Sequence, residues 1–184
     1  MKTKRFELNE IQRKDIVNIH KGLSDPRVTA YYAVHFSTLE DTQEQMDWYD
    51  DLKNKGTGIW WGIYLADSGE FCGAGGFNGL DREHKKAEIG LWLLPEFWGQ
   101  GIMKEVMPRL FQEGFEQLDL NRIEGFVESG NSKCKKGLEK FHFEHEGTMR
   151  QCEFKNGKFI DVDIFSILKS DYEAAREKVH ANEF

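Results

Sequence analysis

The first half of the chain alternates between two hydrophobic patterns, one typical of strands and one typical of helices. Apolar side chains near Lys4–Leu8 predict a short strand. Across Arg13–Leu23 the apolar residues recur every three or four positions, which is the spacing of a helix with one buried face. The run Ser37–Glu40 has the composition of a capping box, in which a hydroxyl and a carboxylate satisfy free amides at a helix start. We expect a helix from there to Lys55-Gly56. Its buried face carries Met46, Tyr49 and Leu52.

Three apolar runs in the middle of the chain predict three consecutive strands. The first is Ile59–Leu65, which ends at an Asp-Ser-Gly turn. The second is Glu70–Leu80, whose glycines weaken a strand or mark a bulge. The third is Glu88–Leu94, which Pro95 stops.

A helix, a strand and a second helix are expected after Pro95. The segment opened by Gly99–Gly101 has apolar residues at helical spacing as far as Leu118, and Pro108 inside it is expected to kink the helix. Arg122–Val127 predicts a strand. Asn131 is a suitable N-cap for the helix that follows it.

The last part of the chain predicts a β-hairpin and a final helix. Asn156-Gly157 is a strong hairpin signal between two strand-like runs, Phe143–Phe154 and Phe159–Leu168. A capping box formed by Ser170 and Glu173 then begins a polar helix. This order predicts an α/β (α+β) architecture, in which about seven strands form a mixed, mostly antiparallel sheet with helices on both faces. We expect residues 1–184 to form one domain.

The composition fits a globular protein that needs no structural staple. The 14 Phe, 5 Trp and 5 Tyr supply core material, and the net charge of -7 disfavours nucleic acid as a partner. The 3 Cys form no CxxC pair and the 6 His lack metal-ligand spacing, so we expect reduced thiols and no metal. The chain shows no signal-like apolar core and no run long enough for a membrane span. We therefore expect a cytoplasmic protein with no membrane partner.

The segment Glu88–Met107 is the most informative part of the sequence. Bare amides at a helix N-terminus, with glycines that let a ligand approach, form an anion site. No Lys-Ser/Thr pair follows the glycines, which excludes a Walker-type phosphate loop. The permissive backbone of glycine explains the same positions without a ligand. These residues alone therefore support an anion site and a plain strand-to-helix turn equally.

Longer segments of the chain resemble a known family. Residues 87–107, AEIGLWLLPEFWGQGIMKEVM, look like the acyl-CoA-binding motif of the GNAT N-acetyltransferases. Residues 122–168, RIEGFVESGNSKCKKGLEKFHFEHEGTMRQCEFKNGKFIDVDIFSIL, resemble the C-terminal half of the RimJ/RimL-type ribosomal-protein N-acetyltransferases. The upstream segment DPRVTAYY…STLEDTQEQM is similar to their first two helices. The resemblance covers nearly the whole chain, and the predicted order of elements matches the GNAT fold.

The resemblance implies a site for acetyl-CoA as cosubstrate. In the family, acetyl-CoA binds where two central strands separate, and its pantetheine arm pairs with the fourth strand, here around Leu91, Trp92 and Leu93. The pyrophosphate lies on the loop that follows the strand. The corresponding loop residues are Gly99, Gln100, Gly101, Ile102 and Met103. Trp98 and Met103 depart from the general family pattern, but both departures recur in the RimL-like branch. Asn131 matches an Asn that contacts the cofactor, and an N-cap role is compatible with that contact.

Acetyl transfer to an amine needs a base for the ammonium, a donor for the oxyanion and an acid for the leaving thiolate. Glu153 matches the RimL-like carboxylate proposed as the base, which acts through a water. With a two-residue turn at Asn156-Gly157, Glu153 faces Ile160, and apolar neighbours raise the pKa of a carboxylate. The residues alone favour the plainer interpretation, an exposed glutamate near the end of a hairpin.

Cys134 occupies the position at which the family's Asn-x-x-Ser motif places a hydroxyl near the thioester sulfur. A thiol donates hydrogen bonds more weakly than a hydroxyl. We nevertheless expect its pKa, about 8.5 when unperturbed, to fall near a helix N-terminus and to permit proton donation. A small buried residue on one stripe with Leu138 and Phe141 explains the position equally well.

The same hairpin register places two aspartates. Asp161 lies opposite Cys152 and is a candidate for binding the amine. Asp163 lies opposite Arg150, and we expect that pair to be a structural cross-strand ion pair.

Two further groups are candidates for the acceptor side. Tyr31, Tyr32 and Phe36, with His35 and Trp48, either line the acceptor pocket or belong to the core. Six carboxylates lie close together in the sequence, and we favour a solvated helix face over recruitment of an amine. They are Glu40, Asp41, Glu44, Asp47, Asp50 and Asp51.

The resemblance implies an acetyl-CoA-dependent N-acetyltransferase acting on a primary amine. The favoured acceptor is a protein N-terminal α-amine, such as that of a ribosomal protein. Two alternatives stay open: the same chemistry on a small amine (a polyamine, an amino sugar or a drug), and a CoA-binding module without turnover. No motif separates the acceptors, because variable loops build that pocket. The family also allows a homodimer.

Overall fold

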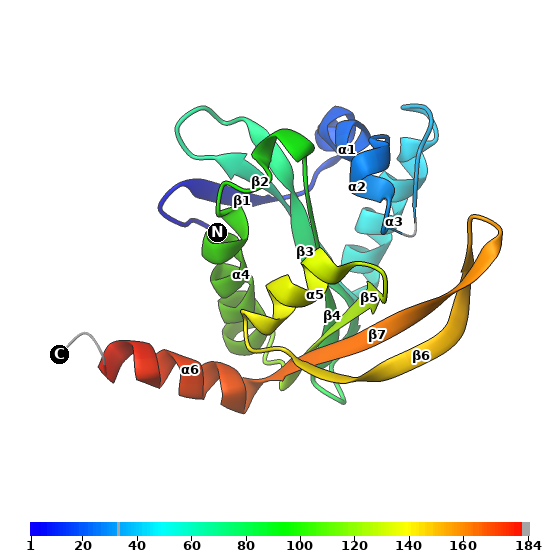
Figure 1. The fold of residues 1–184 in the computed structure, drawn as a ribbon. Helices are drawn as coiled ribbons and strands as arrows, with labels where there is room; N and C mark the ends of the chain where they lie inside the picture. The colour runs from blue at the N-terminus through cyan, green and yellow to red at the C-terminus, as the bar shows by residue number, and fades with distance from the viewer. Residues whose placement is uncertain (33, 182–184) are drawn as a thin grey trace.

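The computed structural model describes residues 1–32 and 34–181, and a seven-stranded sheet runs through it (Figure 1). The strand order is β1-β2-β3-β4-β5-β7-β6. The strands are β1 (Phe6–Glu10), β2 (Ile59–Leu65), β3 (Phe71–Asp81), β4 (Lys86–Leu93), β5 (Arg122–Glu128), β6 (Glu144–Lys155) and β7 (Lys158–Leu168). Every neighbouring pair is antiparallel except β4 and β5, which are parallel. The predicted mixed, mostly antiparallel sheet is confirmed.

Helices cover both faces of the sheet, also as predicted. The helices are α1 (Ile16–Leu23), α2 (Pro26–Thr29), α3 (Thr42–Lys55), α4 (Ile102–Gln112), α5 (Ser132–Glu139) and α6 (Lys169–Ala181). Gly22 of α1 packs so closely on the Trp92 ring of β4 that an added Cβ would lie 2.0 Å from a ring carbon. On the other face, a Cβ at Gly75 would lie 3.3 Å from Leu110 of α4. Trp92 and its neighbour Leu91 point to opposite faces, because side chains alternate along a strand.

The helix boundaries follow the hydrophobic pattern, but two of the predicted caps are wrong by one residue or more. The reciprocal bonds before α3 join Thr38 and Asp41, not Ser37 and Glu40, and α3 begins at Thr42. The first turn of α6 is held by the Asp171 carboxylate, which accepts from the Leu168 amide. In both cases an acidic side chain that is short enough to reach back takes the role of the predicted glutamate.

The helix predicted up to Leu118 also ends differently. The α-helical part of α4 stops at Gln112, and Glu113–Gln117 continue as a π-helical turn. Pro108 lies inside α4 without ending it. Phe115 lies within this turn and is fully buried.

Strands β6 and β7 form a long hairpin that reaches beyond the body of the sheet (Figure 1). The two-residue turn at Asn156-Gly157 and the pairing of Glu153 with Ile160 are confirmed. The register then shifts between Met149 and Glu153, where Gln151 has a positive φ of 51°. The shift is a β-bulge, and it alters the alignment of every residue beyond it.

The bulge overturns the predicted pairing of Asp163 with Arg150. Asp163 pairs instead with Thr148, and its carboxylate binds Lys135 of α5. Asp161 lies beside the bulge, where its Oδ1 accepts from the Gln151 amide at 2.7 Å. The unpaired amide of the bulge therefore fixes Asp161, while side chains of other elements fix Asp163.

Candidate active site

The parallel strands β4 and β5 separate halfway along β4. They pair only where Lys86–Glu88 lie beside Arg122–Glu124. Beyond that point β4 stays paired with β3 as far as Leu93, so its other edge faces an opening. Backbone amides and carbonyls along this edge can bind the amide groups of an extended ligand. The carbonyl of Leu93 is already taken, because it accepts from the Trp98 indole at 2.8 Å. The Leu94 amide bonds to the Cys72 carbonyl of β3, and backbone groups alternate between the two edges of a strand, so Trp92 faces β3 as well. The backbone groups that face the opening are therefore those of Leu91 and the amide of Leu93.

The loop after β4 leads into a helix start that no side chain caps. Gly101 is the N-cap of α4, with a φ of 75°, and Gly99 has the same φ. A Cβ at Gly99 would meet nothing within 4 Å, and one at Gly101 would meet only Arg5, at 3.9 Å. The loop before the first amides of α4, at Ile102 and Met103, is thus open at both glycines. Such amides, together with the dipole of an eleven-residue helix, suit an anion such as a pyrophosphate.

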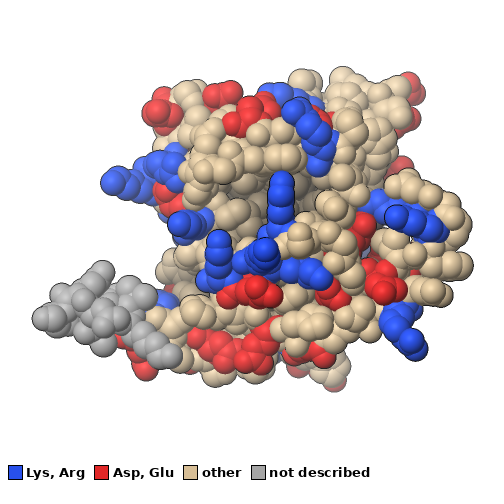
Figure 2. Space-filling view, in the orientation of Figure 1, with Lys and Arg blue, Asp and Glu red and all other residues tan. Residues whose placement is uncertain are grey.

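Positive charge gathers beside this loop. Figure 2 shows Lys and Arg side chains over the centre of the face on which α5 lies, around a hollow in the surface. The α5 sequence supplies Lys133, Lys135 and Lys136. In a chain of net charge -7, such a cluster attracts an anionic ligand to this face.

Asn131 and Cys134 lie at the start of α5. The Asn131 side chain caps the helix by accepting from the Cys134 amide at 3.1 Å. This confirms the predicted N-cap. Cys134 is an exposed free cysteine, but protein around its thiol disfavours the thiolate and raises the pKa of Cys134. The predicted lowering of that pKa is wrong, because burial desolvates the thiol.

Tyr32 faces the point where β4 and β5 separate. Its hydroxyl would lie 3.5 Å from a Cβ on Gly90, which is ordinary van der Waals contact, whereas the Trp60 ring would lie only 2.5 Å away. Burial, and after it the charges of Tyr49, Glu88 and Cys134, raise the pKa of Tyr32 well above its usual value. Tyr32 thus shares one small region with a carboxylate from β4 and the thiol from α5.

Glu88 is a candidate that the sequence patterns missed. Its side chain is half-buried and accepts from Asn78 Nδ2 at 2.8 Å. Burial raises the pKa of Glu88, the Asn78 bond opposes the rise, and the nearby charges of Glu124 and Glu153 add to it. A carboxylate with a raised pKa is suited to accept a proton near neutral pH. A charged residue inside an apolar strand was the signal that could have revealed it.

Glu153 lies on the same face of the sheet as Glu88, on the exposed part of the hairpin. The charge of Glu153 is one of the causes of the raised Glu88 pKa, so the two carboxylates lie near enough to repel each other. The structure brings Tyr32, Glu88, Cys134 and Glu153 together around the separation of β4 and β5.

The other acceptor-side candidates fall into two groups. Tyr31 is exposed, and its hydroxyl lies 3.5 Å from the Gly130 carbonyl, beside Asn131. Trp48 is also partly exposed, and it contacts Tyr49 and the buried Trp60. Phe36 is buried in the core, which is the second of its two predicted roles.

The acidic run on α3 behaves mainly as a solvated face. Asp47 and Asp50 bind Arg13, and Asp51 binds Lys55. Asp41 caps the turn before α3. Within residues 1–32 and 34–181 no group of three or more potential ligands is arranged to hold a metal ion. No helix of the same residues is long and apolar enough to cross a membrane.

A β4 edge open to an extended ligand, an uncapped helix start and a facing carboxylate fit the site of an acyltransferase. The family comparison agrees, because the model of the acetyltransferase (GNAT) domain matches residues 5–144. The chain belongs to the GNAT acetyltransferase family and is an N-acetyltransferase.

Similar proteins support this membership. The uncharacterized N-acetyltransferase p20 of Bacillus licheniformis is 34% identical over 171 residues, which cover 92% of this chain and 96% of p20. Two solved structures share the fold. The spermidine N-acetyltransferase of Vibrio cholerae, in complex with CoA and spermine, has a TM-score of 0.82 at 22% identity, with 91% of this chain and 98% of that chain covered. RimL, the ribosomal L7/L12 alpha-N-protein acetyltransferase, in complex with coenzyme A, has a TM-score of 0.81 at 23% identity, with 91% and 96% covered.

Proposed function

We propose that this N-acetyltransferase moves the acetyl group of acetyl-CoA to the N-terminal α-amine of a protein, such as a ribosomal protein. The observation that carries the choice of a polypeptide acceptor is the apolar rim beside the candidate site. Phe154 and Phe159 are 65% and 62% exposed and meet edge to face at the tip of the β6–β7 hairpin, on the side opposite Glu153. A small amine needs no such surface, whereas the first residues of a polypeptide can pack on it.

The rim is held next to the site. Lys155 donates to the Ala30 carbonyl at 3.0 Å and also binds Glu128 at the end of β5. These two interactions of Lys155 join the hairpin tip to the segment that carries Tyr31 and Tyr32. A polypeptide packed on the two rings must cross the hairpin tip to bring its first amine to the side of Tyr32.

On the cofactor side, we propose that the β4 edge at Leu91–Leu93 holds the pantetheine arm. The amides of Gly99–Met103 hold the pyrophosphate, and Asn131 lies beside the arm. The open space around Gly99 and Gly101 fits a phosphate group, since no side chain fills the loop. Acetyl-CoA supplies an activated acetyl thioester.

For the chemistry, a carboxylate takes the proton that the ammonium must lose before its nitrogen can attack. Glu153 is the base implied by the family resemblance, and Glu88 is the base that burial favours. The C–N bond forms as the C–S bond breaks, and Cys134 donates a proton to the departing sulfur. Its raised pKa keeps the thiol protonated near neutral pH, which an acid requires.

One alternative has support of its own. The first solved structure described above is a spermidine N-acetyltransferase, so a small polyamine is a second acceptor to test. A module that binds CoA without turnover is the other function to test.

The test is release of free CoA thiol from acetyl-CoA over a panel of amines. The panel contains peptides with free N-termini, the same peptides with blocked N-termini, and spermidine. We expect turnover with the free peptides and none with the blocked ones. Preferential turnover of spermidine would replace the proposed acceptor. A thermal shift by acetyl-CoA without thiol release from any amine would indicate a binding module.

A further inference from the structure

Asp163 of β7 is a charged residue buried between α5 and the hairpin. Its side chain is 6% exposed, and it is bound from three directions. Burial raises the pKa of Asp163, but hydrogen bonds from Thr148, Lys135 and Ser129 outweigh it and hold the pKa far below its usual value. The carboxylate therefore stays charged and bound.

Two of the residues that donate hydrogen bonds to Asp163 flank Asn131 and Cys134 in the sequence. Ser129 Oγ donates to Oδ1 at 2.9 Å, and Lys135 Nζ donates to Oδ2 at 2.9 Å. Ser129 precedes Asn131 by two residues, and Lys135 follows Cys134 directly. Asp163 thus holds both ends of the short segment 129–135 that carries Asn131 and Cys134.

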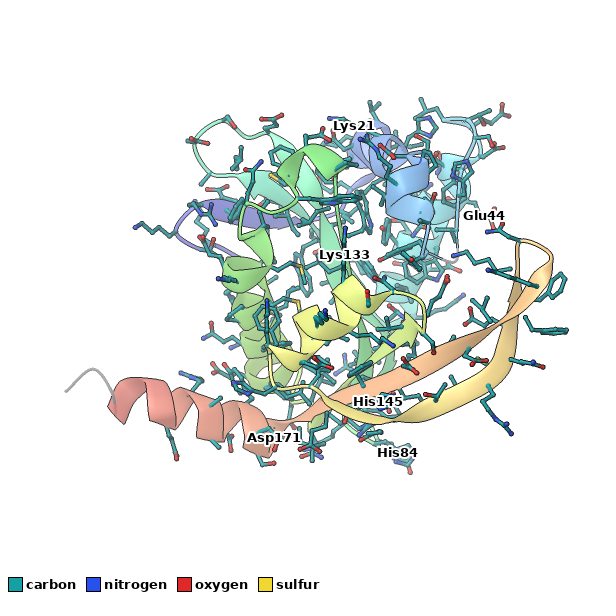
Figure 3. All side chains as sticks on the ribbon, viewed as in Figure 1. Lys21, Glu44, His84, Lys133, His145 and Asp171 are labelled. Carbon is teal, nitrogen blue, oxygen red and sulfur yellow. The ribbon has the colours of Figure 1, made fainter. Side chains whose placement is uncertain are left out.

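The remaining partners come from the other strand of the hairpin. Thr148 Oγ1 donates to Oδ1 at 2.6 Å, and His145 Nε2 lies 3.5 Å from the same oxygen. Figure 3 shows His145 on β6, below α5 in this view. Strand β6 also carries Glu153. One carboxylate therefore links the segment with the proposed acid to the strand with a proposed base.

We propose that Asp163 is a positioning residue, which acts through Lys135 and Ser129 to fix Asn131 and Cys134 against the reacting groups. This inference rests on the proposed function. Stability alone is a weak reason for such an arrangement, because desolvation of two charges offsets most of their attraction. A fixed geometry is a stronger reason, since catalytic groups lose rate when they move by about an ångström.

The experiment compares four variants with one control at a temperature where all are folded. Lys135→Met and Asp163→Asn each remove one charge of the pair, and the double variant removes both. Lys135→Arg keeps the charge. The control, Glu116→Gln, removes a carboxylate that also has several partners (Gln112, Tyr172 and Arg176) but is remote from the site. The readouts are kcat, KM for each substrate, and the thermal midpoint.

We expect Lys135→Met and Asp163→Asn to lower kcat about 10-fold or more, as a lost positioning contact does. The KM for the amine should be nearly unchanged. The double variant should be no slower than the slower single variant, because both changes break one interaction. Lys135→Arg should restore most of kcat. The control should lower the thermal midpoint and leave kcat intact.

Normal kcat in both single variants, with only a lower thermal midpoint, would overturn the proposal and leave Asp163 a structural residue. A wild-type chain that releases no CoA thiol would refute the proposed function instead. The inference would then be read from the alkylation rate of Cys134, with Cys152 as the internal reference. Asp163→Asn should change the Cys134 rate several-fold if Asp163 fixes the segment, and an unchanged rate would overturn it.

Discussion

Asn78 Nδ2 donates to Glu88 Oε2 at 2.8 Å across the β3–β4 pair, beside the point where β4 and β5 separate. A neutral amide orients the carboxylate without cancelling its charge. Lysine or arginine in the same place would lower the pKa of Glu88 and weaken it as a base. The Asn78–Glu88 hydrogen bond therefore leaves a fixed, half-buried carboxylate that can accept a proton beside the separation of β4 and β5.

We predict that Glu88→Gln lowers kcat by about 10²–10⁴-fold if Glu88 is the base, because glutamine keeps the shape but accepts no proton. Glu153→Gln should cause the larger loss if Glu153 is the base. Acetyl-CoA affinity should be nearly intact in both variants. Part of the rate that is lost when the base is replaced should return at alkaline pH, where more of the amine is already neutral. Full activity in both variants would remove both assignments.

The pH profile of kcat/KM separates the two carboxylates further. A base acts when deprotonated, so activity falls as pH drops through its pKa. Removing the Asn78 bond, which lowers the pKa of Glu88, should move this acidic limb to higher pH in Asn78→Ala. Glu153→Gln removes a charge that raises the pKa of Glu88. The acidic limb of the activity that this variant retains should therefore lie at lower pH than that of the wild type. If neither variant moved the limb, Glu88 would not be the titrating base.

The loop after β4 gives a prediction for cofactor binding. Gly101→Val should abolish most of the thermal stabilisation by acetyl-CoA, because its side chain enters the space at the start of α4. A ligand at about 100 times its Kd contributes about 2.7 kcal/mol to stability.

Gly56→Val is the matched control for backbone strain. Gly56 ends α3 with a φ of 66°, close to the 75° of Gly101. An added Cβ meets nothing within 4 Å at Gly56 and only the end of Arg5, at 3.9 Å, at Gly101. Both variants should lose intrinsic stability, since valine is strained at positive φ. Only the Gly101 variant should lose the acetyl-CoA shift. Equal thermal shifts on addition of acetyl-CoA in the two variants would mean that the cofactor binds elsewhere.

Local patterns predicted much of the fold. The apolar run at Ile59–Leu65 forms β2 with the predicted bounds, Asn131 caps α5, and Asn156-Gly157 forms the hairpin turn. Each of these depends on residues within a few positions of one another, which is the range that periodicity and capping rules describe.

The features that the sequence did not predict depend on residues far apart in the chain. The bulge at Gln151 changes the partner of Asp163 from Arg150 to Thr148, and a two-residue turn carries no sign of it. Lys135 and Asp163 meet only because α5 packs over β7. The raised pKa of Glu88 likewise needs Asn78, Glu124 and Glu153 around it. Tertiary contacts set these properties, so no window of the sequence contains them.

Acid should destabilise the protein partly through Glu146. Hydrogen bonds from Arg122 and Ser166 lower the pKa of Glu146 to about 2 from its usual value of 4.5. A lowered folded-state pKa contributes stability above about pH 4.5, and that contribution is lost as pH falls toward 2. The side chain is 41% exposed, so solvent screening makes the effect modest.

The measurement is the free energy of unfolding in urea as a function of pH. The wild type should lose more stability between pH 5 and 2 than Glu146→Gln, and the two curves should converge at the acidic end. Ser166→Ala, which removes one of the two donors, should lie between them. Parallel curves for all three proteins would show that Glu146 keeps an ordinary pKa.

Cys134 gives the last prediction. If its thiol protonates the departing CoA thiolate, Cys134→Ala should slow transfer and Cys134→Ser should keep much of the rate, because serine supplies a donor at nearly the same place. If Cys134 only fills space, the ranking reverses, since a serine without a partner costs more than a small void.

Stability and rate must therefore be measured on both variants of Cys134. Slow transfer by a destabilised serine variant, beside normal turnover by the alanine variant, would contradict the acid role. Even a confirmed role should be modest in size, because a CoA thiolate is a tolerable leaving group. Alkylation gives an independent check, since acetyl-CoA should protect Cys134 if the two are in contact. The buried Cys72 should be unaffected by the cofactor, so protection confined to Cys134 would locate the thioester at the start of α5.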